Sequence, residues 1–285
     1  MRFYITDVFV EEPYSGNQLA VVRGAENLPD ETLQKIALEM NYSETTFMLS
    51  DEERGGGYDV RIFTPAEEIP FAGHPTLGTA FVIRKELLTG SEEAVTLNLK
   101  AGSIIVTFGE FPWMRQLPPT FGGEYDPERI ADALSLGSAD LDKRYPIQEV
   151  TTGLPAIIVP LKSLDALKKC RMNRELYPEV AGKNVYMFCP EPHAAGRGGD
   201  LSARMFTDDP NVPEDPATGS AAGCLAAYLL HHRYLEADTI DVKVEQGYEM
   251  RRPSLLHLHA EEIASGEIAV SVGGKVRMVA RGDLL

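Results

Sequence analysis

Apolar residues recur along the chain in two rhythms, and each rhythm predicts a different kind of element. Between residues 30 and 40 they fall three or four positions apart, at Leu33, Ile36, Ala37 and Met40, which marks one face of a helix. Asp30 is well placed to cap that helix. Shorter segments rich in β-branched and aromatic residues predict strands. These segments are Phe3–Val10, Leu19–Val22, Thr46–Leu49, Asp59–Phe63 and Val95–Leu99.

Two further segments are small or apolar on nearly every side. The first, Leu77–Ile83, follows Pro75 and ends before Gly90, and the second is Ser220–Leu230. Pro is favoured in the first turn of a helix and Gly at its end, so the first segment predicts a helix. A helix that is apolar on every side is buried on every side. We therefore expect an α+β protein with two pseudo-symmetric halves, each a barrel-like sheet wrapped around a central helix.

An internal repeat supports these two halves. The segment Asp59–Thr64 returns as Ser202–Thr207, and the heptad His74–Ala80 returns as Asp215–Ala221, an offset of 141 residues. A third match lies further along the chain, and a weaker fourth one lies nearer the N-terminus. They relate residues 97–102 to 242–247 and residues 19–22 to 155–159. Four matches at nearly one offset indicate a duplicated unit.

The repeat sets the expected domain boundaries. We expect an N-terminal half at residues 1–118, joined by a C-terminal strand at 276–285, and a C-terminal half at residues 128–275. The Pro- and Gly-rich stretch Pro118–Pro127 would separate them.

Composition restricts the functional classes. Among 285 residues, 27 are Lys or Arg and 43 are Asp or Glu, which gives a formal net charge of −16. Such a chain repels phosphate backbones and anionic lipids, so we expect no nucleic acid and no membrane as partner. No apolar run approaches the roughly 18 residues of a membrane span, and early carboxylates argue against a signal peptide. Three widely spaced Cys predict neither a disulfide framework nor a zinc site, and favour a cytoplasmic location.

The two heptads carry the candidate chemistry. In each, a Pro enters the expected helix and a Gly follows three residues later, so the first turn offers free N–H groups to an anion. The small pairs Gly78-Thr79 and Gly219-Ser220 would let a ligand approach the backbone. A small carboxylate would bind between the two helix starts if they face each other. The alternative is simple N-capping by Thr76 and Asp215.

The halves differ at titratable positions. His74 and Asp215 occupy the same place in the heptads, and Glu44 lies in the segment Asn41–Phe47, whose counterpart near Lys183–Tyr186 has no carboxylate. A Glu, a His and an Asp near an anion pocket suit proton transfer. From its own sequence context alone, Glu44 also fits a solvated loop carboxylate.

Other site types find little support. No GxxxxGK[ST] or GxGxxG motif is present, so we expect no nucleotide cofactor. Ser220 lacks the GxSxG frame of a serine hydrolase. The pairs His231-His232 and His257-x-His259 have no carboxylate or Cys cluster beside them, so we expect no metal.

The motifs together resemble the PhzF family of phenazine-biosynthesis-like proteins, in the superfamily of diaminopimelate epimerase and proline racemase. The resemblance implies a diaminopimelate epimerase-like fold, an active site in the cleft between the halves, and a homodimer. The matching segments are Asp7–Phe9, Gly16–Val22, Asn41–Phe47, Arg61–Pro65, Gly73–Ala80, Glu214–Ala221, Gln246-Gly247 and Arg252–Ser254.

The resemblance also assigns roles. It implies that Glu44 is a general acid/base that moves a proton between ring carbons of dihydro-3-hydroxyanthranilate without a metal or organic cofactor. The implied substrate-binding residues are His74, Asp215, Gly219, Ser220, Gly73 and Thr218. Epimerase relatives carry two Cys where this chain has His74 and Asp215, which argues against a two-thiol racemase.

Two positions depart from the family pattern. Gln18 stands where Pro is common, which we interpret as a loop effect, and Arg251 stands where Gly is usual. A long cation at position 251 would narrow the site or anchor a carboxylate. Because the chain is acidic, we expect the site to be locally positive, through the helix starts, His74 and Arg251.

The sequence thus predicts a cofactor-independent isomerase of a small cyclic or unsaturated carboxylate, similar to trans-2,3-dihydro-3-hydroxyanthranilate. The alternatives are an amino-acid racemase or epimerase and a catalytically inactive protein that binds small carboxylates. A hydrolase that uses Ser220 is the weakest reading.

Overall fold

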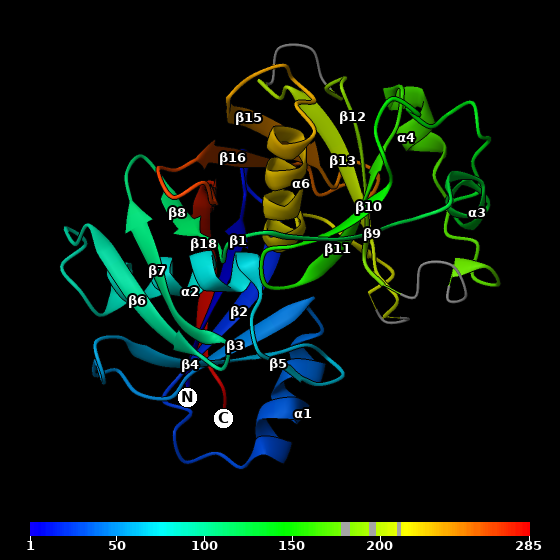
Figure 1. Cartoon of the computed structure of the whole chain (residues 1–285). Helices are drawn as coiled ribbons and strands as arrows, with labels where there is room; N and C mark the ends of the chain where they lie inside the picture. Colours follow the sequence, from blue (N-terminus) through cyan, green and yellow to red (C-terminus); the bar gives the residue numbers. More distant parts are fainter. Residues whose placement is uncertain (178–182, 194–197, 210–211) are drawn as a thin grey trace. The chain divides into compact units, whose positions relative to one another are not determined.

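The structure is a computed structural model of the chain, and it describes residues 1–177, 183–193, 198–209 and 212–285. The chain divides into two compact units (Figure 1). Unit 1 is Met1–Arg115 together with Gly273–Leu285, and unit 2 is Gln116–Val272. Strands dominate both units and helices are few, so the fold class is α+β, as predicted.

Unit 1 wraps its strands in a continuous order. Its elements are β1 (Arg2–Val8), β2 (Asn17–Arg23), α1 (Asp30–Met40), β3 (Glu44–Met48), β4 (Tyr58–Phe63), β5 (Glu68–Ile69), α2 (Gly73–Glu86), β6 (Ala94–Leu99), β7 (Gly102–Phe108), β8 (Pro112–Arg115) and β18 (Val276–Asp283). Hydrogen-bonded neighbours follow the order β18, β1, β2, β3, β4, β6, β7, β8. The pairs β2–β3 and β4–β6 are parallel and the others are antiparallel.

Helix α2 is the central helix of unit 1, as its apolar surface predicts. It packs against strands from both ends of that order, including β1, β2, β7, β8 and β18 (Figure 1). All residues from Gly73 to Ala80 are buried. A Cβ atom on Gly78 would lie 2.5 Å from Cδ2 of Leu19. Gly78 therefore lets the helix approach the sheet, and the expectation that it admits a ligand is wrong.

Unit 2 is built in the same way around a second apolar helix. Its elements are β9 (Thr120–Glu124), α3 (Pro127–Ala133), β10 (Gln148–Thr151), β11 (Pro155–Pro160), α4 (Leu164–Lys169), β12 (Val185–Cys189), β13 (Leu201–Phe206), β14 (Glu214–Asp215), α6 (Gly219–His231), β15 (Thr239–Gln246), β16 (Ser254–Glu262) and β17 (Ile268–Gly273). Helix α6 is buried over nearly its whole length and packs on β10, β11, β15 and β16.

The strand order of unit 2 repeats that of unit 1. Neighbours follow the order β9, β10, β11, β12, β13, β15, β16, and β11–β12 and β13–β15 are the parallel pairs. The short strands β5 and β14 pair with β4 and β13 at the same place in each unit. The repeat seen in the sequence therefore extends to the topology.

The first helix agrees with its prediction in extent but not in its cap. Helix α1 covers Asp30–Met40, and its N-cap residue is Pro29, which provides no side-chain cap. The Asp30 carboxylate instead accepts a hydrogen bond from Arg61 at 2.7 Å, because that cation lies on the neighbouring strand β4. Among the described residues, no helix has the length and apolar character that crossing a membrane requires.

Two local expectations change with the structure. The stretch Pro118–Pro127 contains β9, whose Phe121 pairs with Val150 of β10, and unit 2 begins at Gln116. Gln18 lies in strand β2 opposite Asp7, so its interpretation as a loop residue is wrong.

Candidate functional site

The structure brings Glu44 and His74 together in unit 1. Glu44 is the first residue of β3, beside Leu19 of β2, and His74 lies in the first turn of α2. The distance from Glu44 Oε2 to His74 Nε2 is 3.5 Å. The Glu44 side chain is 17% exposed and that of His74 is 3% exposed, so the carboxylate is the member of the pair that a ligand can reach.

His74 carries no positive charge at neutral pH. Burial lowers the pKa of its imidazole from 6.5 to about 3, and a contact with the backbone of Gln18 only partly opposes this effect. Besides Glu44, the Asn17 side chain contacts the ring of His74, and the distance from Asn17 Nδ2 to His74 Nδ1 is 3.1 Å. The expectation that His74 makes the site locally positive is therefore wrong.

The start of α2 lies two residues before the expected Pro75. Its N-cap is Ala72, in extended conformation and without a side-chain cap, so Gly73 and His74 belong to the first turn. The Thr76 hydroxyl donates to the Ala72 carbonyl at 2.7 Å and does not accept from the backbone, so Thr76 is not a cap. The partial positive charge of this turn remains a source of anion binding.

Helix α6 begins later within the matched heptad. It starts at Gly219, which corresponds to Gly78, and the residues before it are extended because Asp215 pairs with Met205 in the sheet. Gly219 and Ser220 therefore lie in the first turn of α6, and both are buried. The two heptads match in sequence but begin their helices five positions apart.

A hydrogen-bond network holds Asp215 and Thr218. The Thr218 hydroxyl donates to Asp215 Oδ2 at 2.5 Å, so Asp215 is not the helix cap. Gln246, fully buried, donates to the Asp215 carbonyl at 2.8 Å. Its Oε1 accepts from the Thr218 amide at 3.2 Å and from the Tyr186 hydroxyl at 3.0 Å. This network fixes the chain that leads into α6.

Sequence reasoning assigned no role to Asn17 or Gln246. Both stand in motifs that match the family, and Gln246 also ends a segment of the internal repeat. The available signal was an amide residue at the end of an apolar strand. An amide that is 0–1% exposed, as both of these are, needs hydrogen-bond partners inside the protein.

The backbone conformation at Arg251 explains why Gly is usual at this position. It is exposed and its φ is 58°, in the left-handed region that glycine adopts most easily. It lies in a tight turn, in which the Arg252 amide donates to the Gly247 carbonyl at 2.9 Å. The Gly that is usual in the family suits this conformation.

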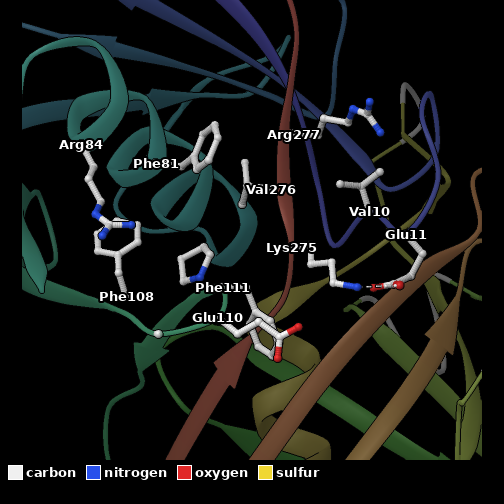
Figure 2. A pocket seen from close by; sticks show the side chains of 12 residues that line it. Val10, Glu11, Phe81, Arg84, Phe108, Glu110, Phe111, Lys275, Val276 and Arg277 are labelled. Atoms are coloured by element: carbon white, nitrogen blue, oxygen red, sulfur yellow. Dashed lines mark hydrogen bonds and ion pairs between the residues drawn. The ribbon is translucent and has the colours of Figure 1, made fainter. Parts of the chain in front are cut away.

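A cavity of about 290 Å³ in unit 1 lies apart from these residues (Figure 2). It is bordered by the later turns of α2, the β7–β8 turn and the start of β18. Arg84 stacks on the Phe108 ring at 4.5 Å, and Lys275 pairs with Glu11 at 3.0 Å. Neither Glu44 nor His74 lines it. It is therefore not the candidate site.

The remaining candidate groups have structural partners. His231 stacks on Phe121 at 4.1 Å, and His232 Nε2 lies 2.8 Å from Gln148 Oε1. Across the described part of the chain, no group of three or more His, Cys, Asp or Glu is arranged to hold a metal ion. Cys224 is buried in α6, and burial raises the pKa of its thiol to about 11, which fits packing.

Comparisons with known proteins agree with one another. The family model PhzC-PhzF, described as phenazine biosynthesis-like protein, matches residues 6–282. A trans-2,3-dihydro-3-hydroxyanthranilate isomerase from Pseudomonas fluorescens is 35% identical, with coverage of 100% of this chain and 99% of the relative. The crystal structure of a PhzF-family protein from Bacillus anthracis matches with a TM-score of 0.90 at 28% identity, covering 100% of this chain and 99% of the other.

A more distant likeness concerns the fold alone. A probable proline racemase from Agrobacterium radiobacter matches with a TM-score of 0.62 at 12% identity, covering 100% of this chain and 92% of the other. The predicted fold relationship is confirmed. With a family match that covers nearly the whole chain, this protein belongs to the PhzC-PhzF family of phenazine biosynthesis-like proteins.

Proposed function

We propose that this protein is a PhzF-type isomerase that moves a proton between two carbons of a small cyclic or unsaturated carboxylate, with Glu44 as the general acid/base. The observation that carries the proposal is the placement of Glu44. Its partly exposed carboxylate lies 3.5 Å from a buried His74, at the start of the central helix. Relatives that share nearly the full length are named isomerases.

The reaction needs one base and no change of oxidation state. Glu44 removes a proton from a carbon beside an electron-withdrawing group, which leaves a carbanion delocalised over the adjacent double bond. The same carboxyl then returns the proton one allylic position away, so substrate and product have the same composition. Backbone N–H groups in the first turn of α2, at Gly73 and His74, would stabilise the negative charge that develops.

The substrate-binding role of the unit 2 residues remains part of the proposal. Asp215 and Thr218 are held by Gln246, and Gly219 and Ser220 form the first turn of α6. A fixed turn with backbone donors suits a carboxylate. Their joint use with Glu44, the homodimer and the cytoplasmic location stay predictions.

The substrate we propose is trans-2,3-dihydro-3-hydroxyanthranilate or a close analogue, because relatives of 33% and 35% identity carry that substrate in their names. Incubation with this compound in heavy water tests the proposal. The wild type is expected to give isomerised product, and Glu44→Gln to lose at least about a hundredfold in rate. The matched control is Glu39→Gln, which makes the same exchange of a carboxylate for a carboxamide at an exposed residue of α1. It should keep the wild-type rate.

Three results would overturn the proposal. A Glu44→Gln variant with the wild-type rate would remove Glu44 from the mechanism. Deuterium exchange at the α-carbon of an amino acid with loss of optical activity would instead identify a racemase. Thermal stabilisation by the carboxylate without any isotope exchange would identify a binding protein that lacks turnover.

A further inference from the structure

Asn17 is placed to act on the ring of His74. It is the first residue of β2, opposite Val8 of β1, and it is 1% exposed. Its amide nitrogen lies 3.1 Å from Nδ1 of His74, and the other ring nitrogen, Nε2, lies 3.5 Å from Glu44 Oε2. The imidazole is therefore located between an amide group on one side and a carboxylate on the other.

The chemistry of these groups selects one tautomer. An amide nitrogen only donates hydrogen bonds, and a neutral imidazole has one donor and one acceptor nitrogen. If Asn17 donates to Nδ1, the ring proton must be on Nε2, which lies 3.5 Å from Glu44 Oε2, a separation at which the two atoms face each other without forming a hydrogen bond. The contact with Asn17 thus sets the position of the ring proton, which then lies on the side of the ring that faces Glu44. Burial, which lowers the pKa of His74 to about 3, keeps the ring in this neutral form.

We propose that Asn17 is a positioning residue that fixes the ring tautomer of His74, so that His74 presents a neutral N–H on the side of Glu44 and is not a second base. The tautomer is a property of the resting protein. Only its effect on turnover rests on the proposed function.

The tautomer of His74 decides which group of the Glu44–His74 pair can transfer a proton. A ring whose Nε2 already carries a proton cannot accept another one there unless it becomes a buried cation, which burial opposes. The Glu44 side chain, at 17% exposure, is also the member of the pair that a substrate can reach. Within this pair, Glu44 is therefore the group that both removes and returns the proton.

The competing arrangement is also defined by the structure. The backbone of Gln18 contacts the ring and favours a ring proton. The alternative arrangement places that proton on Nδ1. In that arrangement Nε2 would present a lone pair to the Glu44 carboxylate. Glu44 is a titratable group within ion-pair distance of the ring.

Nitrogen-15 NMR of the imidazole distinguishes the two arrangements. We expect a pyridine-type shift for Nδ1 and a pyrrole-type shift for Nε2 of His74 at pH 7, assigned with a His74→Asn variant. Asn17→Asp replaces the donor by an acceptor of the same shape and should reverse the two shifts. Asn17→Ala, which removes the donor without adding an acceptor, should give averaged shifts.

The matched control is Asn173→Asp in unit 2. It makes the same charge change, and the Asn173 Oδ1 that accepts from the Glu175 amide is retained by the carboxylate. This variant should leave the His74 shifts unchanged. A pyrrole-type Nδ1 in the wild type, or unchanged shifts in Asn17→Asp and Asn17→Ala, would overturn the proposal.

Turnover provides a second readout that a merely structural role would not produce. In Asn17→Asp the new carboxylate raises the pKa of His74, and at pH 8 the neutral ring lacks a donor at Nε2. We expect a loss of about tenfold or more at pH 8. Activity should recover as the pH falls and His74 becomes doubly protonated, because both nitrogens then donate. If the wild type fails to turn over the compound, the proposed function fails while the NMR result still decides the tautomer.

Discussion

Units 1 and 2 have the same arrangement of strands, and even some of their ion pairs correspond. Arg61 of β4 pairs with Glu68 of β5 at 2.9 Å, and Arg204 of β13 pairs with Glu214 of β14 at 2.8 Å. Each guanidinium also lies over the ring of a phenylalanine two residues later, at 5.1 Å and 4.9 Å. The strand order and the direction of each pairing are the same as well. The repeated parts are those that hold the sheet together.

The units differ where strands and helices begin. Thr45 pairs with Phe63 in unit 1, and Val185 pairs with Phe206 in unit 2, so the residue that corresponds to Glu44 is Asn184. The predicted absence of a carboxylate at this place in unit 2 is confirmed. The sequence match relates His74 to Asp215, but in the strand pairing Asp215 takes the place of Ile69, because Asp215 pairs with Met205 as Ile69 pairs with Ile62. The comparison indicates that the two units share a duplicated scaffold and differ at the positions for which we propose a catalytic role.

The largest difference in stability should separate the two arginines. The Arg204 side chain is 4% exposed and also donates to the carbonyls of Leu167 and Cys170, whereas that of Arg61 is 24% exposed. Arg204→Met should cost about 3 kcal/mol in the free energy of unfolding, because it leaves a partly buried carboxylate and two carbonyls without a donor. Arg61→Met should cost about 1 kcal/mol or less. Urea denaturation measures both, and equal costs would contradict the difference in burial.

A smaller effect should follow from the buried His74, for which unit 2 has Asp215. The folded pKa of His74 is about 3 and the unfolded value is near 6.5, so only the unfolded chain binds a proton between these values. Stability from His74 is present above about pH 6.5 and is lost as the pH falls toward 3. The loss is about 1.4 kcal/mol per pH unit at most.

Replacement of His74 should remove this contribution. His74→Gln should flatten the fall in stability between pH 6 and pH 4.5 that urea denaturation of the wild type shows. His259→Gln, at a side chain that is 38% exposed, is the control and should keep the wild-type slope. An unchanged slope in His74→Gln would show that the imidazole titrates normally in the folded protein.

The smallest expected effect concerns two left-handed residues, one in each unit. Arg251 has φ 58° and Asn41 has φ 52°. Arg251→Gly should stabilise unit 2 by roughly 0.5–1 kcal/mol because it relieves a backbone cost. Asn41→Gly should change the stability of unit 1 by a smaller amount, since Asn tolerates the left-handed conformation better than Arg does. Thermal unfolding compares them, and destabilisation by Arg251→Gly would show that the side chain has a packing role.

The two central helices could be predicted from the sequence because the apolar pattern that buries each of them lies within a single segment. A segment such as Leu77–Ile83 or Ser220–Leu230 has no polar face, so it must be enclosed. The repeat predicted the second unit for a similar reason, since matched segments at one offset adopt the same topology. The family motif led to Glu44, and the structure places it beside His74.

The remaining features depend on tertiary contacts that no local pattern contains. The start of each central helix follows a short paired strand, because Gly73 comes four residues after Ile69 and Gly219 four residues after Asp215. The neutral state of His74 follows from its burial, and the roles suggested for Asn17 and Gln246 follow from residues 57 and 31 positions away in the chain. Charge and residue type alone had predicted a positive His74, and burial reversed that expectation.

The central claim is that Glu44, and not the shared scaffold, makes unit 1 chemically active. It is tested most directly by Glu44→Asn, which gives unit 1 the residue that Asn184 provides in unit 2. The measurement is deuterium incorporation from heavy water into trans-2,3-dihydro-3-hydroxyanthranilate and its isomer, followed by NMR. We expect incorporation by the wild type and none above background in the variant, with an unchanged unfolding temperature. Incorporation by Glu44→Asn at the wild-type rate would contradict this claim.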